Sequence, residues 1–230
     1  MTDPLVFLSE RCPYNAGNIL ASVRGKMYFG IMLANGQIGV SSTLGITLET
    51  DALLVTKIDL NRQDHRIFQL AYANAVLNYE QEYPLTGDIF DLVQFGKDKP
   101  TVMIGYFPPL VEKFRSAGLP LKVFDLQKEH ADLSGAAELP SATSAAGQVI
   151  ISATSLINKS VSEILAYAKT KTDLYLLGPS TPLNEQMRKN FGFTHLFGMI
   201  FEPYEFAVME MIGQGLGTQS FSSKGEKVKL

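Results

Sequence analysis

The sequence predicts an α/β protein in two parts, a small α+β domain followed by an open, mostly parallel sheet. Two observations concern the first part: an Asn-Gly pair between two β-rich runs, and a long segment with helical apolar spacing. In the second part, short apolar runs alternate with helical patterns from Lys99 onward. We place the domains at 1–97 and 98–217, and we expect 218–230 to be a flexible, lysine-rich tail without function.

The first domain contains a predicted hairpin and a predicted helix. The segment 26–42 carries Asn35-Gly36, and both residues tolerate the positive φ angles of a tight turn. A helix over 64–82 follows, with an apolar stripe expected to pack on the hairpin sheet. Asn74 is a polar residue on this stripe and must find hydrogen bonds. It either faces the cleft between the domains or links the helix to the hairpin.

The second domain is predicted to alternate strands and helices. The strands lack clean alternation of apolar and polar residues, as expected for a parallel sheet covered on both faces. Gly118, Gly192 and either Gly213 or Gly215 stand where helices end. The stretch 127–147 breaks the rhythm and holds a loop or a short helix. The predicted strands are 101–107, 121–126, 148–154, 173–178 and 195–201, and the predicted helices are 109–118, 155–170, 182–192 and 203–215.

Composition excludes several classes of protein. The net charge is -3 and the pI is about 5.7, so no broad cationic face is available for nucleic acid. No apolar run reaches the ~18 residues of a membrane helix. With one cysteine and no signal-peptide pattern at the N-terminus, we expect a cytoplasmic protein. The expected partner is a small, anionic molecule, and a homo-oligomer is possible.

The candidate site follows from the parallel sheet. Ligands of such sheets bind beyond the carboxyl ends of the strands, so the residues there should converge on one edge. The segment YLLGPSTPL at 175–183 is the most distinctive, because a glycine, two prolines and two hydroxyls follow a buried strand. The candidate ligand-binding residues are Asn74, Gly105, Tyr106, Asp125, Thr154, Asn158, Gly178, Pro179, Ser180 and Thr181.

Each candidate also has a purely structural interpretation. Gly105 lacks the G-x-G-x-x-G pattern of a dinucleotide site and can simply form a tight turn. Asp125 could hold a ribose or cap a turn. Ser180 and Thr181 could N-cap a helix starting near Pro182, which is compatible with an anion bound at the same place. Asn158 could be an ordinary surface residue.

Catalytic and metal-binding groups are not recognisable in the sequence. There is no G-x-S-x-G nucleophile elbow, and no histidine lies near Cys12. His65, His130 and His195 are isolated and lack the spacing of metal ligands. We therefore assign no catalytic residue, no metal ligand and no cofactor from the sequence.

Several of these motifs together resemble a known family. IGYFPPLVEKF, Thr154 followed by Asn158, the Gly-Pro-Ser-Thr-Pro run and a later HLFG are similar to the uncharacterised bacterial and archaeal family labelled "putative heavy-metal chelation". The resemblance covers 101–215, and the preceding half is similar to the enolase N-terminal domain. The chain departs from the family pattern in reading Ser152-Ala153-Thr154 in place of Thr-Gly-Thr, and in having Lys159 in place of a small residue.

The resemblance implies a Rossmann-like second domain, loosely similar to methyltransferases, and an active site shared by both domains. It also implies condensation or hydrolysis of small molecules related to pterins, flavins or metal chelators. The alternative is a non-catalytic protein that binds an anionic metabolite or a metal chelate. We expect no tight binding of S-adenosylmethionine, because Tyr106 and Pro108 would crowd the cofactor. With so few soft ligands, we expect metal to enter as part of a bound chelate.

Overall fold

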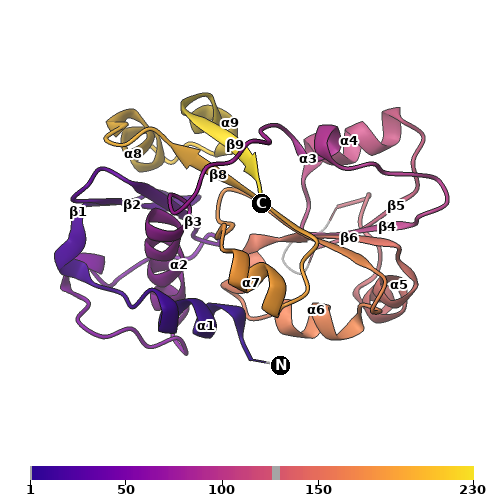
Figure 1. Ribbon diagram of the computed structural model, residues 1–230, viewed down its shortest axis with the longest axis horizontal. Helices are drawn as coiled ribbons and strands as arrows, with labels where there is room; N and C mark the ends of the chain where they lie inside the picture. The colour runs from indigo at the N-terminus through magenta and orange to yellow at the C-terminus, as the bar shows by residue number, and fades with distance from the viewer. Residues whose placement is uncertain (1, 126–129) are drawn as a thin grey trace.

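Two sheets organise the computed structural model of the protein, which describes residues 2–125 and 130–230. One is a three-stranded antiparallel sheet, and the other has six strands. Figure 1 shows the two sheets side by side along the long axis, with β8 running between them. We call the part built on the small sheet the N-terminal lobe and the part built on the large sheet the sheet lobe.

The N-terminal lobe confirms the predicted hairpin and helix. The strands β2 (Tyr28–Leu33) and β3 (Ile38–Ser42) pair antiparallel, with Gly36 in the turn at φ +86°, and β1 (Ile19–Arg24) adds a third strand. The helix α2 (Gln63–Leu77) packs on this sheet. Contact is close at Gly39, where an added Cβ would lie 2.0 Å from the carbonyl oxygen of Ala71. A short helix not predicted from the sequence, α1 (Pro4–Arg11), lies beside α2.

The sheet lobe is the predicted open sheet. Its strand order is β5-β4-β6-β7-β8-β9, and the first five strands in this order are parallel. This order differs from that of dinucleotide-binding Rossmann sheets and matches flavodoxin-like sheets, so the point where the order reverses lies between β4 and β6. The bounds are β4 (Thr101–Ile104), β5 (Leu121–Phe124), β6 (Gln148–Ser152), β7 (Asp173–Leu177), β8 (His195–Phe201) and β9 (Gly225–Lys229).

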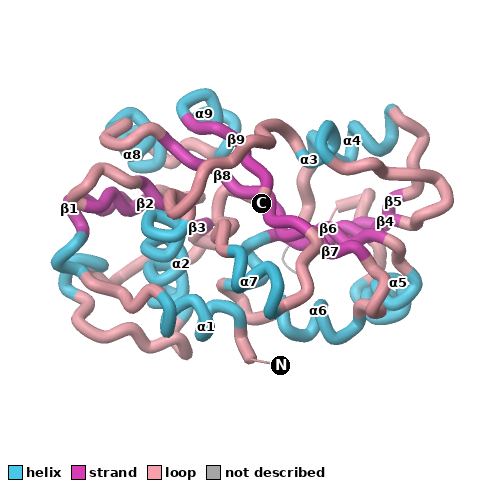
Figure 2. Tube along the Cα trace, viewed as in Figure 1, coloured by secondary structure: helices cyan, strands magenta, loops and turns pink. Residues whose placement is uncertain are grey.

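Helices cover both faces of the large sheet. Figures 1 and 2 show α3 (Ile89–Leu92) and α4 (Pro108–Ser116) on one face, and α5 (Leu139–Ala145), α6 (Val161–Tyr167) and α7 (Glu185–Asn190) on the other. The helix predicted from residue 155 starts only at Val161, because Ala153–Leu156 form a 3-10 turn. The helix α5 falls within the irregular stretch 127–147, of which 127–129 lie outside the described residues.

The C-terminal residues correct one prediction. Residues 218–230 are not a frayed tail: α9 (Thr218–Phe221) is followed by β9, which pairs antiparallel with β8. The physical reason is that Val228 is buried in the core and the β9 backbone completes the ladder at the edge of the sheet.

The helix that precedes residues 218–230 packs on the N-terminal lobe. α8 (Phe206–Gly213) lies against β1 and β2, and Met32 shares an apolar cluster with Met209 and Ile212. The small sheet is thus enclosed between α2 and α8, and the two lobes share continuous apolar packing. No helix among the described residues is both long and apolar enough to span a membrane.

Candidate functional site at the carboxyl edge of the sheet

Three loops contain most of the candidate residues predicted from the sequence, and they begin at neighbouring strands. In the sheet, Ile104 pairs with Ile151 and Ser152 pairs with Leu177, so the loops after β4, β6 and β7 leave neighbouring strand ends. The reversal of strand order lies at the first two of these ends, which is where ligands of open α/β sheets bind. The loops that carry Gly105 and Tyr106, Thr154 and Asn158, and residues 178–181 therefore start from one edge of the sheet.

Position 105 requires a glycine, because a side chain there would collide with Ser152. It has φ +103°, and an added Cβ would lie 2.5 Å from the Cβ of Ser152. The Ser152 hydroxyl in turn forms a 2.8 Å hydrogen bond with the hydroxyl of Thr154, which is half-buried. A pair of linked hydroxyls thus occupies the point where β4 and β6 diverge.

Asp125 and Tyr106 are linked to each other. The Oδ2 atom of Asp125 accepts the backbone N–H of Tyr106 at 2.9 Å, which is the turn-capping role. The Tyr106 hydroxyl donates to Asp132 at 3.2 Å, and its ring lies 4.7 Å from that of His130. Asp125 therefore shapes the turn after β4 in addition to any contact with a ligand.

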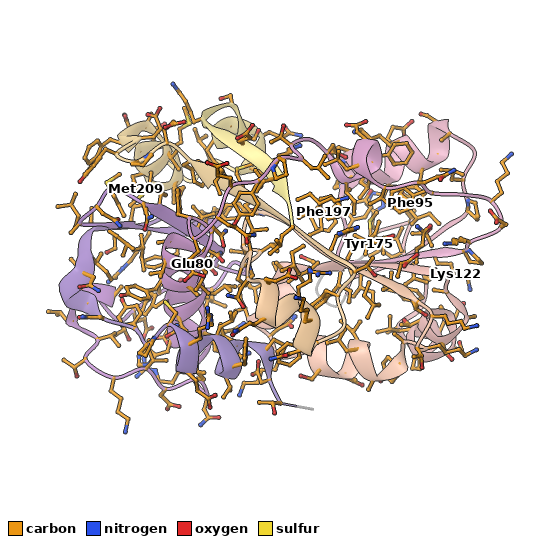
Figure 3. All side chains as sticks on the ribbon, viewed as in Figure 1. Glu80, Phe95, Lys122, Tyr175, Phe197 and Met209 are labelled. Carbon is orange, nitrogen blue, oxygen red and sulfur yellow. The ribbon has the colours of Figure 1, made fainter. Side chains whose placement is uncertain are left out.

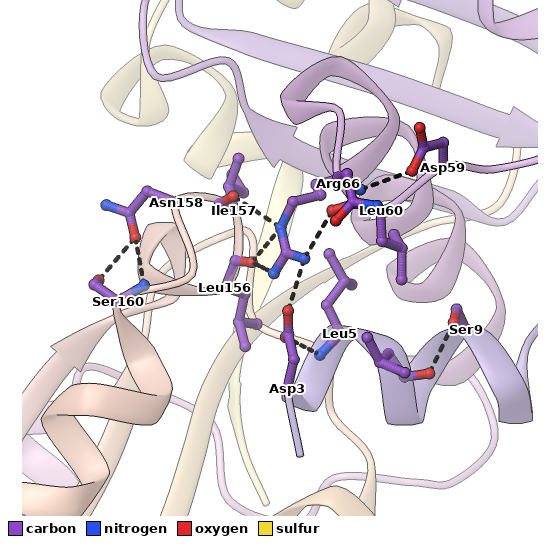
Figure 4. Close-up of polar contacts among 12 residues, drawn as sticks. Asp3, Leu5, Ser9, Asp59, Leu60, Arg66, Leu156, Ile157, Asn158 and Ser160 are labelled. Atoms are coloured by element: carbon purple, nitrogen blue, oxygen red, sulfur yellow. Dashed lines mark hydrogen bonds and ion pairs between the residues drawn. The ribbon is translucent and has the colours of Figure 1, made fainter. Parts of the chain in front are cut away.

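The loop after β6 has a strained backbone. Lys159 adopts φ +67°, an unfavourable value for a residue with a long side chain, and it is exposed. The Oδ1 atom of Asn158 accepts the N–H of Ser160 at 3.1 Å and its hydroxyl at 2.7 Å (Figure 4). Its Nδ2 group has no partner among the described residues. Asn158 thus forms a local turn and keeps two donors available.

The loop after β7 is anchored by the N-terminal lobe. The Ser180 Oγ atom accepts the N–H of Ser42 at 2.9 Å, and Asn78 donates to the carbonyl of Thr181 at 3.1 Å. Asn78 also accepts the N–H of Leu183 at 2.7 Å. Ser180 is only 2% exposed and Thr181 is fully buried, so both side chains lie beneath the surface of the edge.

The structural interpretation of Ser180 and Thr181 as helix caps is wrong. The helix begins at Glu185, and its cap is Asn184, whose Oδ1 accepts the N–H of Met187 at 2.9 Å. Pro182 lies outside the helix. Gly178 has φ +130°, and no atom lies within 4 Å of an added Cβ, so the backbone there is open to approach.

Asn74 links the helix to the hairpin, the second of its two interpretations. Its Nδ2 group donates to the carbonyl of Val40 at 2.8 Å, and the residue is 1% exposed. The Oδ1 atom is buried and has no partner among the described residues. Asn74 therefore sits inside the helix–hairpin contact, where its side chain is inaccessible to solvent.

Arg66 joins the two lobes from a buried position, and it was not identified from the sequence. It is 1% exposed and donates from Nε to the carbonyl of Ile157 at 2.9 Å and from Nη2 to that of Leu156 (Figure 4). Nη1 pairs with Asp3 at 2.7 Å. Asn78, the C-cap of α2, follows Asn74 by four residues, so the two amides lie near one face of the helix, and this spacing could have drawn attention to Asn78. No comparable pattern in the sequence marks Arg66.

The described residues form no metal site at this edge. Across residues 2–125 and 130–230, no three His, Cys, Asp or Glu side chains are placed to hold a metal ion together. His65 instead accepts the N–H of Asp59 at 2.9 Å, and Cys12 is buried. Two cavities, of about 400 and 300 Å³, lie elsewhere and contain none of the predicted site residues.

Fold and site together define a two-lobed α/β protein with an open parallel sheet whose carboxyl edge faces a smaller α+β lobe. Residues 88–230 match the family described as "Putative heavy-metal chelation", DUF364, and the chain belongs to this family. No curated protein matches the sequence.

Two crystal structures share the fold over nearly the whole chain. The first is a DUF364 protein of unknown function from Pyrococcus horikoshii, with a TM-score of 0.82, 20% identity and 99% coverage of both chains. The second is a DUF364 protein of unknown function from Desulfitobacterium hafniense DCB-2, with a TM-score of 0.77 and 18% identity, covering 99% of this chain and 96% of that chain.

Proposed function

We propose that the protein binds a small anionic metabolite, of the class that chelates metal ions, at the carboxyl edge of the large sheet. The observation that carries this proposal is the position of α2. Through Arg66 and Asn78 this helix fixes the loop after β6, which leaves the strand-order reversal, and the neighbouring loop after β7. Lys159, which is strained at φ +67°, lies on the loop after β6, and strain of this kind accumulates at binding sites. Gly178 lies on the loop after β7, where its positive φ is unstrained because it has no side chain.

The available groups favour an anion. Lys159 is exposed and forms no ion pair with the described residues, and Asn158 has a free amide Nδ2 group on the same loop. The half-buried hydroxyl of Thr154 lies at the start of that loop. Amide donors and a lysine suit carboxylate oxygens. Gly178 lets such a ligand come close to the backbone of the neighbouring loop.

The finer assignment, a condensation or hydrolysis of pterin-, flavin- or chelator-related compounds, needs a general acid or base. Asp125 is the carboxylate that directly follows β5, and it accepts the N–H of Tyr106. Asp132 accepts the Tyr106 hydroxyl at 3.2 Å, and the His130 ring lies 4.7 Å from the Tyr106 ring, so further groups that could carry a proton stand beside this turn. The second function raised from the sequence, binding and release of the ligand unchanged, needs none of them.

Calorimetric titration with citrate and with its ferric complex tests the proposal. We expect Asn158→Ala and Lys159→Ala each to weaken binding about 5- to 30-fold, corresponding to about 1–2 kcal/mol for a charge-assisted hydrogen bond. Lys122→Ala is the matched control, because this exposed lysine lies on β5 away from the edge (Figure 3) and pairs with Glu138. Unchanged affinity in both site variants would place the ligand elsewhere. Recovery of altered products by mass spectrometry would instead establish turnover.

A further inference from the structure

The strand β1 is an edge of the small sheet, and no further strand of the described chain pairs with its outer side. The sheet order is β1-β2-β3, so β1 and β3 are the two edges. All six residues of β1 are partly or fully exposed, whereas five of the six residues of β2 are buried. Figure 1 shows β1 at the end of the N-terminal lobe that lies away from the sheet lobe.

The hydrogen-bond pattern shows which backbone groups of β1 face outwards. In an antiparallel pair, residues that bond the neighbouring strand alternate with residues whose N–H and C=O point away from it. The N–H of Gly25 donates to the carbonyl of Tyr28 at 2.8 Å, so Gly25 and then Val23 bond β2. The N–H and C=O of Ser22 and Arg24 therefore point outwards. Across residues 2–125 and 130–230, no segment outside the small sheet bonds these groups.

The other sheet edges are covered by the chain itself. On β3, the side chains of Tyr79, Asn74 and Ser180 bond the outward backbone groups. Residues 85–87 bond the outer side of β9, and residues 133–134 lie along the outer side of β5, where the N–H of residue 134 donates to a strand carbonyl at 2.8 Å. Within the described part of the chain, β1 is thus the one edge without such a bond.

Exposed leucines lie beside this uncovered edge. The 3-10 turn η2 (Ala52–Leu54) contacts β1, and its Leu53 and Leu54 are 43% and 78% exposed. Leu20, at the bulge of β1, is 52% exposed. Apolar side chains gathered on two contacting elements are typical of protein interaction surfaces. The edge therefore combines unpaired backbone groups with apolar side chains.

The charge at this edge suits a second copy of the same chain. Charged side chains on an edge strand usually discourage pairing. Arg24 is the one charged residue in β1, and it pairs with Asp51 at 3.5 Å, so two copies would not bring uncompensated arginines together. An antiparallel strand pair is also self-complementary, because both strands present the same N–H and C=O groups about a twofold axis.

We propose that two copies of the chain associate through β1, antiparallel about a twofold axis, so that their small sheets join into one continuous sheet. The N–H and C=O of Ser22 bond the C=O and N–H of Arg24 of the second copy, which uses every outward group identified above. The exposed leucines of each copy lie near the junction and lose contact with solvent. The competing occupant is a strand of a different protein. This inference does not rest on the proposed function.

Sedimentation equilibrium over a concentration series tests the proposal. One strand and a few leucines make a small interface, so we expect a reversible dimer of the 25.3 kDa chain with a Kd of about 1–100 µM. Ser22→Pro removes an outward N–H and keeps the bonds to β2, so it should weaken dimerisation about tenfold or more. A parent protein that stays monomeric up to about 500 µM refutes the proposal. An undiminished dimer of folded Ser22→Pro refutes it as well.

A leucine pair locates the interface independently. Leu54→Asp changes a highly exposed side chain, so the fold should survive, and dimerisation should weaken about tenfold or more. Leu85→Asp is the matched control, because this leucine is 47% exposed and lies on the segment beside β9. Its dimer should be as tight as that of the parent. Equal dimer affinities of the two variants refute the proposal, and this comparison decides if Ser22→Pro does not fold by circular dichroism.

Discussion

Replacing Arg66 by methionine should loosen the contact between the two lobes. The methionine fills most of the space of the arginine stem, so the main loss is polar. The variant removes the donors to the carbonyls of Leu156 and Ile157 and the ion pair with Asp3. Asp3 remains 22% exposed and still caps α1 through the N–H of Leu5, so its carboxylate keeps partial solvation.

The expected destabilisation is about 3–5 kcal/mol. Each buried carbonyl left without a donor costs about 1–3 kcal/mol, and breaking a buried ion pair by removing one partner typically costs about 3–5 kcal/mol in total. A typical domain has a free energy of unfolding of about 5–15 kcal/mol, so the loss would be a large part of the stability.

Urea unfolding provides the assay. The chain has nine tyrosines and no tryptophan, so tyrosine fluorescence and circular dichroism are the suitable signals. With m near 2–3 kcal/mol/M, the midpoint should fall by about 1–2 M. Arg62→Met is the control, because Arg62 is also on this helix end but is 51% exposed and pairs with Asp64 at the surface. If the two variants have the same midpoint, the argument that Arg66 joins the lobes is refuted.

Four further predictions concern single groups. Burial alone would raise the pKa of Asp64, but hydrogen bonds from Arg62, Thr50 and a backbone N–H lower it from 3.8 to about 2. Asp64→Asn should therefore be less stable than the parent above about pH 4, with the difference vanishing towards pH 2; a constant difference in thermal scans would contradict this. Burial raises the pKa of the Cys12 thiol to about 12, so a thiol reagent should label it slowly in the native protein and rapidly in urea, and fast native labelling is the contrary result. The dialysed protein should contain no stoichiometric zinc, copper or nickel by elemental analysis; one metal per chain, lost without unfolding on combined replacement of Cys12 and the three histidines, would disprove it. Calorimetry should detect no tight binding of S-adenosylmethionine, and a micromolar Kd would overturn that expectation.

Local patterns predicted most of the architecture. The Asn35-Gly36 turn and the five apolar runs after Lys99 are each determined by residues adjacent in the sequence. The structure has a hairpin and five strands at these positions, as expected. β9 was missed because its sequence, GEKVK, is polar apart from Val228 and becomes a strand only against β8. The strand order was likewise not readable, since it depends on crossovers and not on local propensity.

The candidate edge was predictable from topology, but the roles of its residues were not. Parallel strands place their carboxyl ends together, so residues such as Thr154 and Gly178 were found from their positions after strands. The burial of Ser180 depends on Ser42, which lies 138 residues away in the chain. Arginine is rarely fully buried, and the partners of Arg66 are backbone carbonyls 90 and 91 residues further on, so nothing local marked it.

The packing of α8 on the small sheet has a consequence for how the chain is made. The Tyr204 hydroxyl donates to the carbonyl of Ala34, 170 residues earlier, and Met209 and Ile212 cover the face of the sheet that carries Met32. At the usual pace of translation, about 5–20 residues per second, that face stays uncovered for roughly 10–30 s after the hairpin leaves the ribosome. The first lobe to be synthesised thus stays incomplete until α8 has been made near the end of the chain, and a nascent chain halted before α8 should expose an apolar surface to chaperones.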